Sequence, residues 1–271
     1  MLAMRTFLKP TKLKMLFLVE WVVYMVIELS RAKLRTAHQL MVAGYPLIVF
    51  YLISCALAAA ALARTPTRLP RWRHLLGLAV LLVALEQLIK AAVGAFIPYR
   101  GSVPIIPGWL HLAHARNMHG SWLAREFGIG FMGTGALIAM WAIALPCFVL
   151  GFRYYAVRKR RSLWLDVASV TIVAGVGGAL CDIALRGYIL DFINLPGVVT
   201  ADLKDIFTYV GLAALFAELV DNPGISLTWQ GWQRELERTR RLVRGFAAFS
   251  AREVYGVART ILGCASRERG R

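Results

Sequence analysis

Long apolar stretches limit this chain to a membrane fold. A helix needs about 20 predominantly apolar residues to cross the hydrocarbon core of a bilayer. Five stretches meet or approach that length, at 41–63, 75–97, 128–152, 164–185 and 205–220. Hydrophobic residues make up 58% of the chain, more than the roughly 45–50% of a soluble domain. We therefore expect an all-α integral membrane protein.

The positive charge predicts how the chain lies in the membrane. Lys and Arg total 32 against 15 Asp and Glu, and they concentrate in segments 64–73, 153–161 and 234–244. Connections rich in Lys and Arg stay in the cytoplasm, so loops 98–127 and 186–204 are expected outside. The excess charge also favours binding to anionic lipid headgroups. No nucleic-acid-binding module is recognisable, and no nucleic-acid partner is expected.

Two extensions flank a predicted core at 74–221. The first, 1–73, contains the apolar stretch 41–63 and a shorter one, 15–29, which carries Glu20 and Glu28. The shorter stretch is either another span or an interfacial helix, so the chain has five or six spans. Basic residues before it favour a cytoplasmic N-terminus and six.

The second extension, 222–271, is a basic tail. Its apolar residues recur at helical spacing with Arg between them, among them Trp232, Leu236, Phe246 and Val254. This pattern is typical of an amphipathic helix that lies on the cytoplasmic membrane surface.

Glu86 and Lys90 are charged residues within the stretch 75–97. Four residues apart on a helix, with Glu first, they are placed to form an ion pair. We interpret the pair as structural, because each charge neutralises the other. The four cysteines have no spacing typical of a metal site, and we expect neither a metal nor an organic cofactor.

Asp191 and Asp205 border the short segment 192–204 between the last two apolar stretches. Antiparallel helices with so short a connection place their outer ends side by side. Two carboxylates held close together share one proton, which is the arrangement of the aspartic proteases. Both residues could instead simply cap helices near water, and the spacing alone leaves these two interpretations open.

Three motifs occur in order within 74–221. They are Glu86-Gln87-Leu88-Ile89-Lys90, then Val103-Pro104-Ile105-Ile106-Pro107-Gly108-Trp109-Leu110 with His114-Ala115-Arg116-Asn117, then Gly178-Ala179-Leu180-Cys181-Asp182 through Gly187-Tyr188-Ile189-Leu190-Asp191-Phe192-Ile193. Together they resemble the motifs of the lipoprotein signal peptidases (signal peptidase II), membrane-embedded aspartic peptidases of bacteria. The resemblance implies a four-span core with a loop region on its outer face.

The resemblance also implies roles for individual residues. Asp191 matches the first catalytic aspartate of that family. Asp205 matches the second, because Gly211 follows it six residues later as in the family, and Asp202 then stands where the family motif N-x-A-D has Asn. Asp202 remains the alternative, since Ala201-Asp202 also reads as the A-D of that motif. Asn117, Asp182 and Asp202 are expected to position the substrate.

The implied substrates are prolipoproteins whose cysteine has been lipidated. The implied location is the bacterial inner membrane, where a multi-pass monomer would hold its active site at the periplasmic face. Trp109 and Trp122 of the loop 98–127 are expected at the interface, where they would cover the site.

Some positions depart from the family pattern. Glu86 replaces an Asp, Ala179 replaces the Asn of G-N-x-x-D-R, and Ile183 replaces its Arg. These losses thin the polar surroundings of the predicted dyad. A catalytically weak or inactive scaffold that binds signal segments or a membrane partner is therefore the alternative function. A proton-coupled transporter has less support, because no internal repeat is visible.

Overall fold

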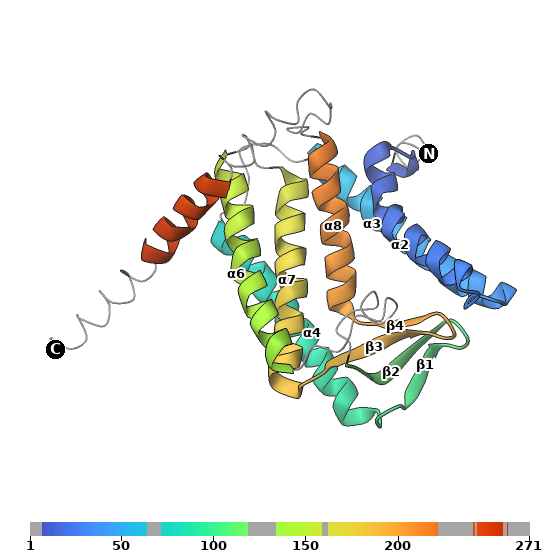
Figure 1. Cartoon of the computed structure of the whole chain (residues 1–271). Helices are drawn as coiled ribbons and strands as arrows, with labels where there is room; N and C mark the ends of the chain where they lie inside the picture. The colour runs from blue at the N-terminus through green and yellow to red at the C-terminus, as the bar shows by residue number, and fades with distance from the viewer. Residues whose placement is uncertain are drawn as a thin grey trace.

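The computed structural model describes residues 7–63, 72–118, 134–158, 162–221, 241, 243–256 and 259. The described part is mostly helical and carries one small sheet (Figure 1). In chain order its elements are α2 (Lys12–Ser30), α3 (Ala37–Ala63), α4 (Trp72–Phe96), β1 (Ser102–Ile106), β2 (Leu110–Asn117), α6 (Thr134–Arg158), α7 (Leu163–Arg186), β3 (Ile189–Leu195), β4 (Val199–Ala201) and α8 (Leu203–Asp221).

The helices lie close to the predicted apolar stretches. Among the described residues, α3, α4, residues 135–157 of α6, and α7 are long and apolar enough to cross a membrane. The helices α2 and α8 have 19 residues each and carry more charge. At 1.5 Å per residue, α8 is about 28 Å long, and it runs beside α7 (Figure 1). Residues 128–133, predicted to open the stretch at 128–152, lie outside the described part.

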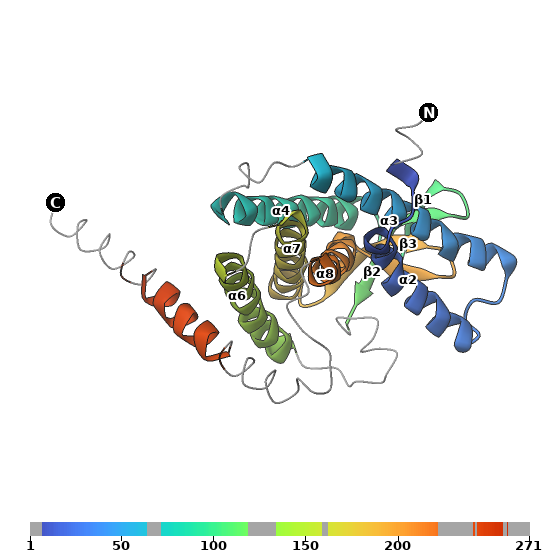
Figure 2. The ribbon, with the colours of Figure 1, turned by 90° about the horizontal axis from the view of Figure 1, so that it is seen from above.

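Helix α7 is the centre of the bundle. Figure 2 shows it surrounded by α4, α6 and α8, and most of its residues are buried. Small residues allow this close packing, as is common between membrane helices. A Cβ atom added at Gly211 of α8 would lie 2.5 Å from Cγ1 of Ile172 and 3.1 Å from its backbone nitrogen. The middle of α8 is therefore held tightly against α7.

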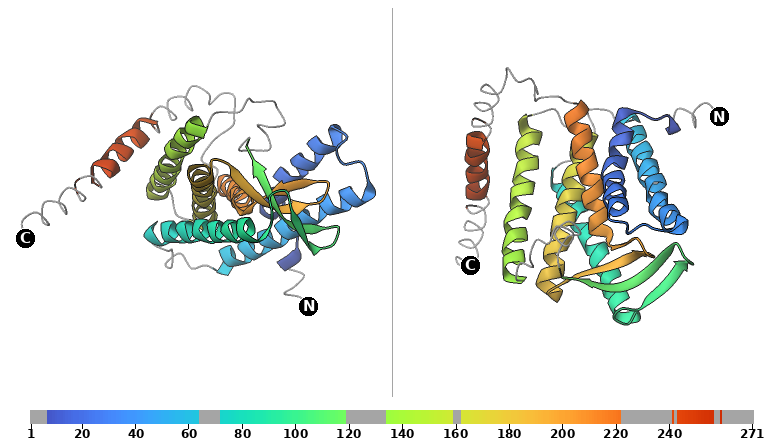
Figure 3. Two further views of the ribbon diagram at one scale, coloured as in Figure 1. Left: turned by 90° about the horizontal axis from the view of Figure 1, so that it is seen from below. Right: turned by 45° about the vertical axis from the view of Figure 1, so that its right-hand side comes forward.

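An antiparallel sheet occupies the segments that the sequence analysis expected to be loops. Its strand order is β1-β2-β3-β4, and it lies at one end of the helices, hereafter the sheet end (Figure 3). Irregularities interrupt the register between Pro104 and Ile106 and between Leu112 and Ala115. Bulges shift side chains from one face to the other, so the apolar pattern of these strands does not alternate cleanly.

The N-terminal helices α2 and α3 pack against each other and against α8 and α7. Pro46 lies within α3 and lacks a backbone N–H, and one turn before it the carbonyl oxygen of Ala43 accepts a 2.7 Å hydrogen bond from the indole of Trp21. The hydroxyl of Tyr209 on α8 accepts from the backbone N–H of Trp21 and donates to the carbonyl of Phe17, at 2.9 and 2.8 Å. Trp21 and Phe17 are four residues apart, so the hydroxyl of Tyr209 lies between a backbone N–H and the carbonyl that would accept from it in a regular helix.

Part of the basic tail is helical and contacts α6. Phe246 and Phe249 pack against the ring of Tyr154, with centroids 5.7 and 5.6 Å away. Arg153 forms a 2.8 Å ion pair with Glu253. Val254 is 61% exposed, and Trp232 and Leu236 lie outside the described residues. Contact with the membrane surface stays a prediction for this segment.

Trp109, expected at the interface, lies at the turn between β1 and β2. Its ring packs against those of His38 and Tyr45, with centroids 5.8 and 6.3 Å away. Both partners belong to α3, so the N-terminal extension contacts this turn of the sheet. Trp122 lies outside the described part of the chain.

Candidate active site

Three carboxylates meet at the sheet end of α8. Asp191 lies in β3, Asp202 directly precedes α8, and Asp205 lies in its first turn. The β3–β4 hairpin folds the chain back, so that oxygen atoms of all three lie within 4.8 Å of one another. A single water molecule can bridge carboxylates at such a separation. Asp191 and Asp205 are thus as close as the sequence analysis expected for a dyad.

Asp202 and Asp205 also fix the start of α8. The backbone N–H of Asp205 donates to Oδ1 of Asp202 at 3.1 Å, and that of Asp202 donates to Oδ2 of Asp205 at 3.2 Å. This reciprocal pattern is a capping box, which satisfies N–H groups that a helix start leaves free. The capping interpretation therefore holds for Asp205, which also lies close to Asp191, whereas Asp191 itself lies in strand β3 and caps no helix there.

Lys204 lies among the three carboxylates. Its Nζ atom is 2.8 Å from Oδ2 of Asp202, 3.1 Å from Oδ1 of Asp205 and 4.0 Å from Oδ1 of Asp191. The side chain is 5% exposed. The sequence analysis missed this residue. Its signal was a lysine between two aspartates at the start of an apolar helix, where a charge needs a partner. We call Lys204 and these three aspartates the Lys204 cluster.

Exposure separates the two candidates for the second catalytic aspartate. Asp202 is fully buried, whereas the side chain of Asp205 is 50% exposed. Asp191 is 5% exposed, and its Oδ1 atom has no hydrogen-bond partner among the described residues. Of the two candidate dyads, Asp191 with Asp205 therefore combines a buried carboxyl group with an accessible one, whereas Asp191 with Asp202 is buried throughout.

The environment of Asp191 favours its protonated form. Burial raises the pKa of Asp191 to about 8; Lys204 opposes this shift, and the negative charges of Asp202 and Asp205 add to it. A hydrogen bond from the side chain of Asn117 at the end of β2 also lowers the pKa. Burial alone would raise the pKa of Asp202, but Lys204 and Lys90 hold it below its ordinary value. The carboxyl group of Asp191 is thus neutral while that of Asp202 is charged.

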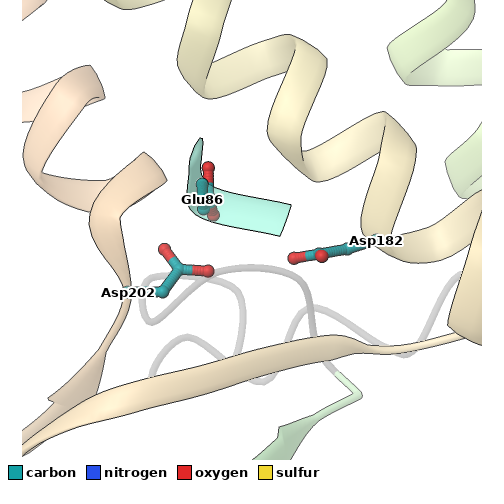
Figure 4. A group of neighbouring side chains, drawn as sticks. All are labelled: Glu86, Asp182 and Asp202. Atoms are coloured by element: carbon teal, nitrogen blue, oxygen red, sulfur yellow. The ribbon is translucent and has the colours of Figure 1, made fainter. Parts of the chain in front are cut away.

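A second cluster surrounds Lys90 of α4. Its Nζ atom lies 2.6 Å from Oε1 of Glu86 and 2.6 Å from Oδ2 of Asp202, and it also binds Asp182. Figure 4 shows the three carboxylates pointing toward one shared space. All four side chains are fully buried. Glu86 and Lys90 therefore form the expected ion pair within a larger network, which we call the Lys90 cluster.

Arg186 completes this network. It donates to Oδ1 of Asp182 at 2.9 Å and to Oε1 of Gln87 at 2.6 Å. The position at which the family motif has Arg, Ile183, is buried in apolar contacts instead. Because residues four apart lie on the same helix face, the next turn of α7 supplies a guanidinium that the motif comparison counted as lost.

The substrate-positioning residues occupy different surroundings. Asn117 contacts Asp191, whereas Asp182 and Asp202 are buried around Lys90. Any positioning by the two buried aspartates would therefore act through the cluster and not by direct contact with a substrate. Their role stays a prediction.

An apolar groove of about 450 Å³ begins at the Lys204 cluster. Lys204 and Asp205 form its polar end, and Glu20 of α2 contributes a further carboxylate. The remaining wall is mainly apolar and comes from α6, α7 and α8, with Trp141, Phe148, Ile172, Val176, Leu212 and Leu215. The Oε1 atom of Glu20 is buried without a hydrogen-bond partner among the described residues. The N-terminal extension therefore helps to line the groove.

Each cluster has three carboxylates spaced as in a metal site. In each, a lysine ammonium group lies among the carboxylate oxygens and balances their charge. These donors are therefore already occupied by protein cations, and no residue is assigned to a metal.

Comparison with known proteins decides the family. Residues 78–221 match the family model described as signal peptidase (SPase) II. This range covers more than half of the chain and contains both clusters. The protein belongs to the signal peptidase II family. The matched segment extends from α4 to the end of α8, so α2, α3 and the tail are outside the family region.

Three known proteins are each similar to about half of this chain. A lipoprotein signal peptidase from Lactiplantibacillus plantarum is 31% identical over 131 residues, which cover 46% of this chain and 80% of the relative. One from Microcystis aeruginosa is 28% identical over 140 residues, covering 51% and 85%. A solved bacterial membrane enzyme has a TM-score of 0.47 at 20% identity and covers 56% of this chain and 90% of its own.

Proposed function

We propose that the protein is an aspartic endopeptidase that removes signal peptides from lipidated prolipoproteins. The observation that best supports this proposal is the position of buried Asp191 and accessible Asp205 at the polar end of an apolar groove. Their carboxylates are close enough for one water molecule to bridge them. The family assignment and the names of the relatives support the same substrate class. Asp191 and Asp205 are the proposed catalytic residues, and no metal or organic cofactor takes part.

Geometry suggests different roles for the two carboxyl groups. Lys204 is closer to Asp205 than to Asp191, so it stabilises negative charge mainly on Asp205. Asp205 would then take a proton from a water molecule, whose oxygen attacks the scissile carbonyl carbon. Asp191 would donate its proton to the carbonyl oxygen as the tetrahedral intermediate forms. Transfer of a proton from Asp205 to the leaving nitrogen then allows the carbon–nitrogen bond to break.

The groove fits the apolar part of a signal peptide. Such a segment is helical in the membrane, and the aromatic and aliphatic side chains of α6, α7 and α8 offer it an apolar surface. The lipidated cysteine would lie at the sheet end, beside Asp205. Helices α3 and α6 both end away from the sheet (Figure 1). In the sequence, the basic segment 64–73 follows α3 and the basic segment 153–161 includes the end of α6. This supports a periplasmic sheet end in a multi-pass inner-membrane protein.

We also propose a role for each of the three segments of the chain. Residues 74–221 would form the catalytic core, with 1–73 as an N-terminal membrane extension and 222–271 as a basic cytoplasmic tail that contacts anionic lipid headgroups. The contacts of α2 with α8 and the groove support a fixed place for the first extension. We propose a monomer, because each element of the candidate site comes from one chain.

A second function is favoured by Lys204 itself. It stands where the family motif N-x-A-D has Ala, and its ammonium group lies 3.1 Å from Asp205. A cation so close weakens a carboxylate as a base. The alternative is therefore a family scaffold that binds lipoprotein signal segments or a membrane partner without cleaving them.

Incubation of the purified full-length protein with a lipidated prolipoprotein distinguishes the two functions. We expect the wild type to release the signal peptide and Asp191→Asn to release none, since an amide cannot donate the required proton. Asp221→Asn is the matched control, because Asp221 is exposed at the far end of α8. Equal binding of the substrate by wild type and Asp191→Asn, without cleavage by either, would instead establish the scaffold.

A further inference from the structure

A second cavity, which is polar, lies at the sheet end. It has a volume of about 400 Å³ and is bordered by the turn after α4 and by β2, β3 and β4. Asn117 contacts Asp191, whereas the next side chain back along β2, that of Arg116, lines this cavity. The residues that line this cavity and those that line the groove do not overlap, so the two are separate.

Positive charge dominates the cavity wall. Arg100 and Arg116 line it, together with the neutral hydrogen-bonding groups of Ser102, Asn194 and Thr200. No acidic side chain is among the described residues of this wall. Two guanidinium groups among neutral polar groups suit an anion with several oxygen atoms.

Arg116 is held in place by two aromatic rings. Its Cζ atom lies 4.4 Å from the ring centre of Tyr99 and 4.6 Å from that of Tyr188. These two cation–π contacts order the guanidinium group, whose N–H groups can still donate to a ligand. Because the side chain is ordered before a ligand arrives, less conformational entropy is lost on binding.

Arg100 is also fixed by its backbone. Its φ angle is +65°, in the left-handed region, which a residue other than glycine rarely adopts. The backbone N–H of Arg100 donates to the carbonyl of His114 at 3.0 Å, and that of His114 donates to the carbonyl of Gly101 at 3.0 Å. These bonds hold the turn after α4 against β2 and keep Arg100 at the cavity.

His114 is a largely buried side chain beside the cavity. The side chain is buried, at 7% exposure, and its Nδ1 atom lies 2.8 Å from the carbonyl oxygen of Ile97. A carbonyl can only accept, so Nδ1 carries hydrogen, and in a neutral ring Nε2 is then an acceptor. Nε2 is buried without a hydrogen-bond partner among the described residues. The bond to Ile97 therefore fixes the ring at the cavity wall, while Nε2 itself is shielded from a ligand in the cavity.

The cavity lies at the depth of lipid headgroups. The spanning helix α4 ends at Phe96, which is 84% exposed, and the first cavity residue, Tyr99, follows three residues later at 48% exposure. Exposed aromatic side chains at the end of a span mark the boundary between hydrocarbon and headgroups. Phosphate groups are the anions concentrated at that level.

We propose that this cavity binds a phosphate ester, the headgroup of an anionic phospholipid such as phosphatidylglycerol in the leaflet at the sheet end. Arg100 and Arg116 would bind the phosphate oxygens, and Ser102 and Asn194 would donate to the same group. The proposal does not depend on whether Asp191 and Asp205 cleave a substrate.

Native mass spectrometry of the delipidated full-length protein tests this site. Phosphatidylglycerol is titrated alongside diacylglycerol with the same acyl chains, with inorganic phosphate as competitor. We expect each protein to bind one phosphatidylglycerol molecule tightly and to bind diacylglycerol much more weakly. Millimolar inorganic phosphate should displace the phosphatidylglycerol. Arg116→Gln should weaken the lipid at least tenfold. Arg35→Gln, which removes an exposed charge from the α2–α3 connection at the same end, should leave it unchanged.

A second variant keeps the test valid if Arg116→Gln disturbs the sheet. Ser102 is exposed at the cavity edge, so Ser102→Glu adds a negative charge and leaves the stacked rings intact. It should also weaken phosphatidylglycerol at least tenfold. Equal effects of Arg116→Gln and Arg35→Gln, or diacylglycerol binding as well as phosphatidylglycerol, would overturn the proposal. Binding of phosphate without phosphatidylglycerol would overturn the lipid as its source.

Discussion

The Lys90 cluster and the Lys204 cluster use similar residues and differ in their contact with the outside. Each places a buried lysine among three carboxylates, and Asp202 belongs to both. In the Lys90 cluster every one of these side chains is fully buried, whereas in the Lys204 cluster Asp205 is half exposed at the groove. Ion pairs closed off from solvent can hold helices together, but hydrolysis needs a carboxylate that substrate and water can reach.

The strongest test of the difference between the two clusters compares Asp205→Asn, in the Lys204 cluster, with Asp182→Asn, in the Lys90 cluster. Asp205→Asn should lower cleavage by roughly 10²–10⁴-fold, the range of an acid–base contribution, with little change in unfolding temperature. Asp182→Asn should lower the unfolding temperature and leave cleavage per folded molecule close to that of the wild type. Rates are measured with lipidated prolipoprotein and normalised to folded protein. Equal loss of cleavage in two folded variants would show that both clusters take part in the chemistry.

The Lys90 cluster should carry the larger share of stability. Lys90→Met leaves Glu86, Asp182 and Asp202 with one fewer cation in a buried site. Removal of one partner from a buried ion pair costs about 3–5 kcal/mol, so we expect a loss of that size. Equilibrium unfolding in mixed micelles measures it, with Arg153→Met, which removes a partly exposed ion pair, as the control. A loss no larger than the control's would contradict the structural role.

The pH dependence of cleavage reports on the Lys204 cluster. Asp191 holds its proton up to its raised pKa of about 8, so cleavage should fall about tenfold per pH unit above that value. Lys204 lowers the pKa of Asp191, so Lys204→Ala should move this decline to higher pH. An unchanged alkaline limit in Lys204→Ala would mean that another group sets it.

The same proton affects stability. Folded Asp191 keeps its proton from its ordinary pKa of 3.8 up to about 8, whereas the unfolded chain releases it. The folded state therefore binds more protons in this interval, and the contribution of Asp191 to stability falls as the pH rises through it. In Asp191→Asn this part of the pH dependence of unfolding should disappear.

The smallest effect is expected from the basic tail. Truncation after residue 228 removes the contacts of Phe246 and Phe249 with Tyr154 and the partly exposed pair Arg153–Glu253. An exposed ion pair contributes about 0–1 kcal/mol, so cleavage should be nearly unchanged while binding to anionic vesicles weakens. Complete loss of cleavage by a folded truncated protein would contradict a peripheral tail.

Helices and sheet differed in how well the sequence predicted them. A span must be apolar along its whole length, and this signal located α4, α7 and α8 close to their observed bounds. The sheet gave no comparable signal, because bulges at 104–106 and 112–115 disturb the alternation and β4 has only three residues. The strands at 102–117 were therefore expected to be an outer loop.

The candidate site was predictable where the chain turns back on itself. A short connection between antiparallel helices predicted that Asp191 and Asp205 would approach each other. Two features depended on three-dimensional neighbours and were missed. Lys204 can be buried because three carboxylates from separate positions surround it. Arg186 binds Asp182 from the next helical turn, whereas the comparison with the family motif considered only the aligned position, Ile183.

The hydroxyl of Tyr209 between Trp21 and Phe17 has a consequence for how the protein is made. Ribosomes deliver α2 to the membrane before α8, so during synthesis the backbone of α2 lacks the partner that the finished structure gives it at this turn. Helix α2 can complete its contacts only when the last core helix has entered the bilayer. Helix α2 is thereby made early and completes its contacts late.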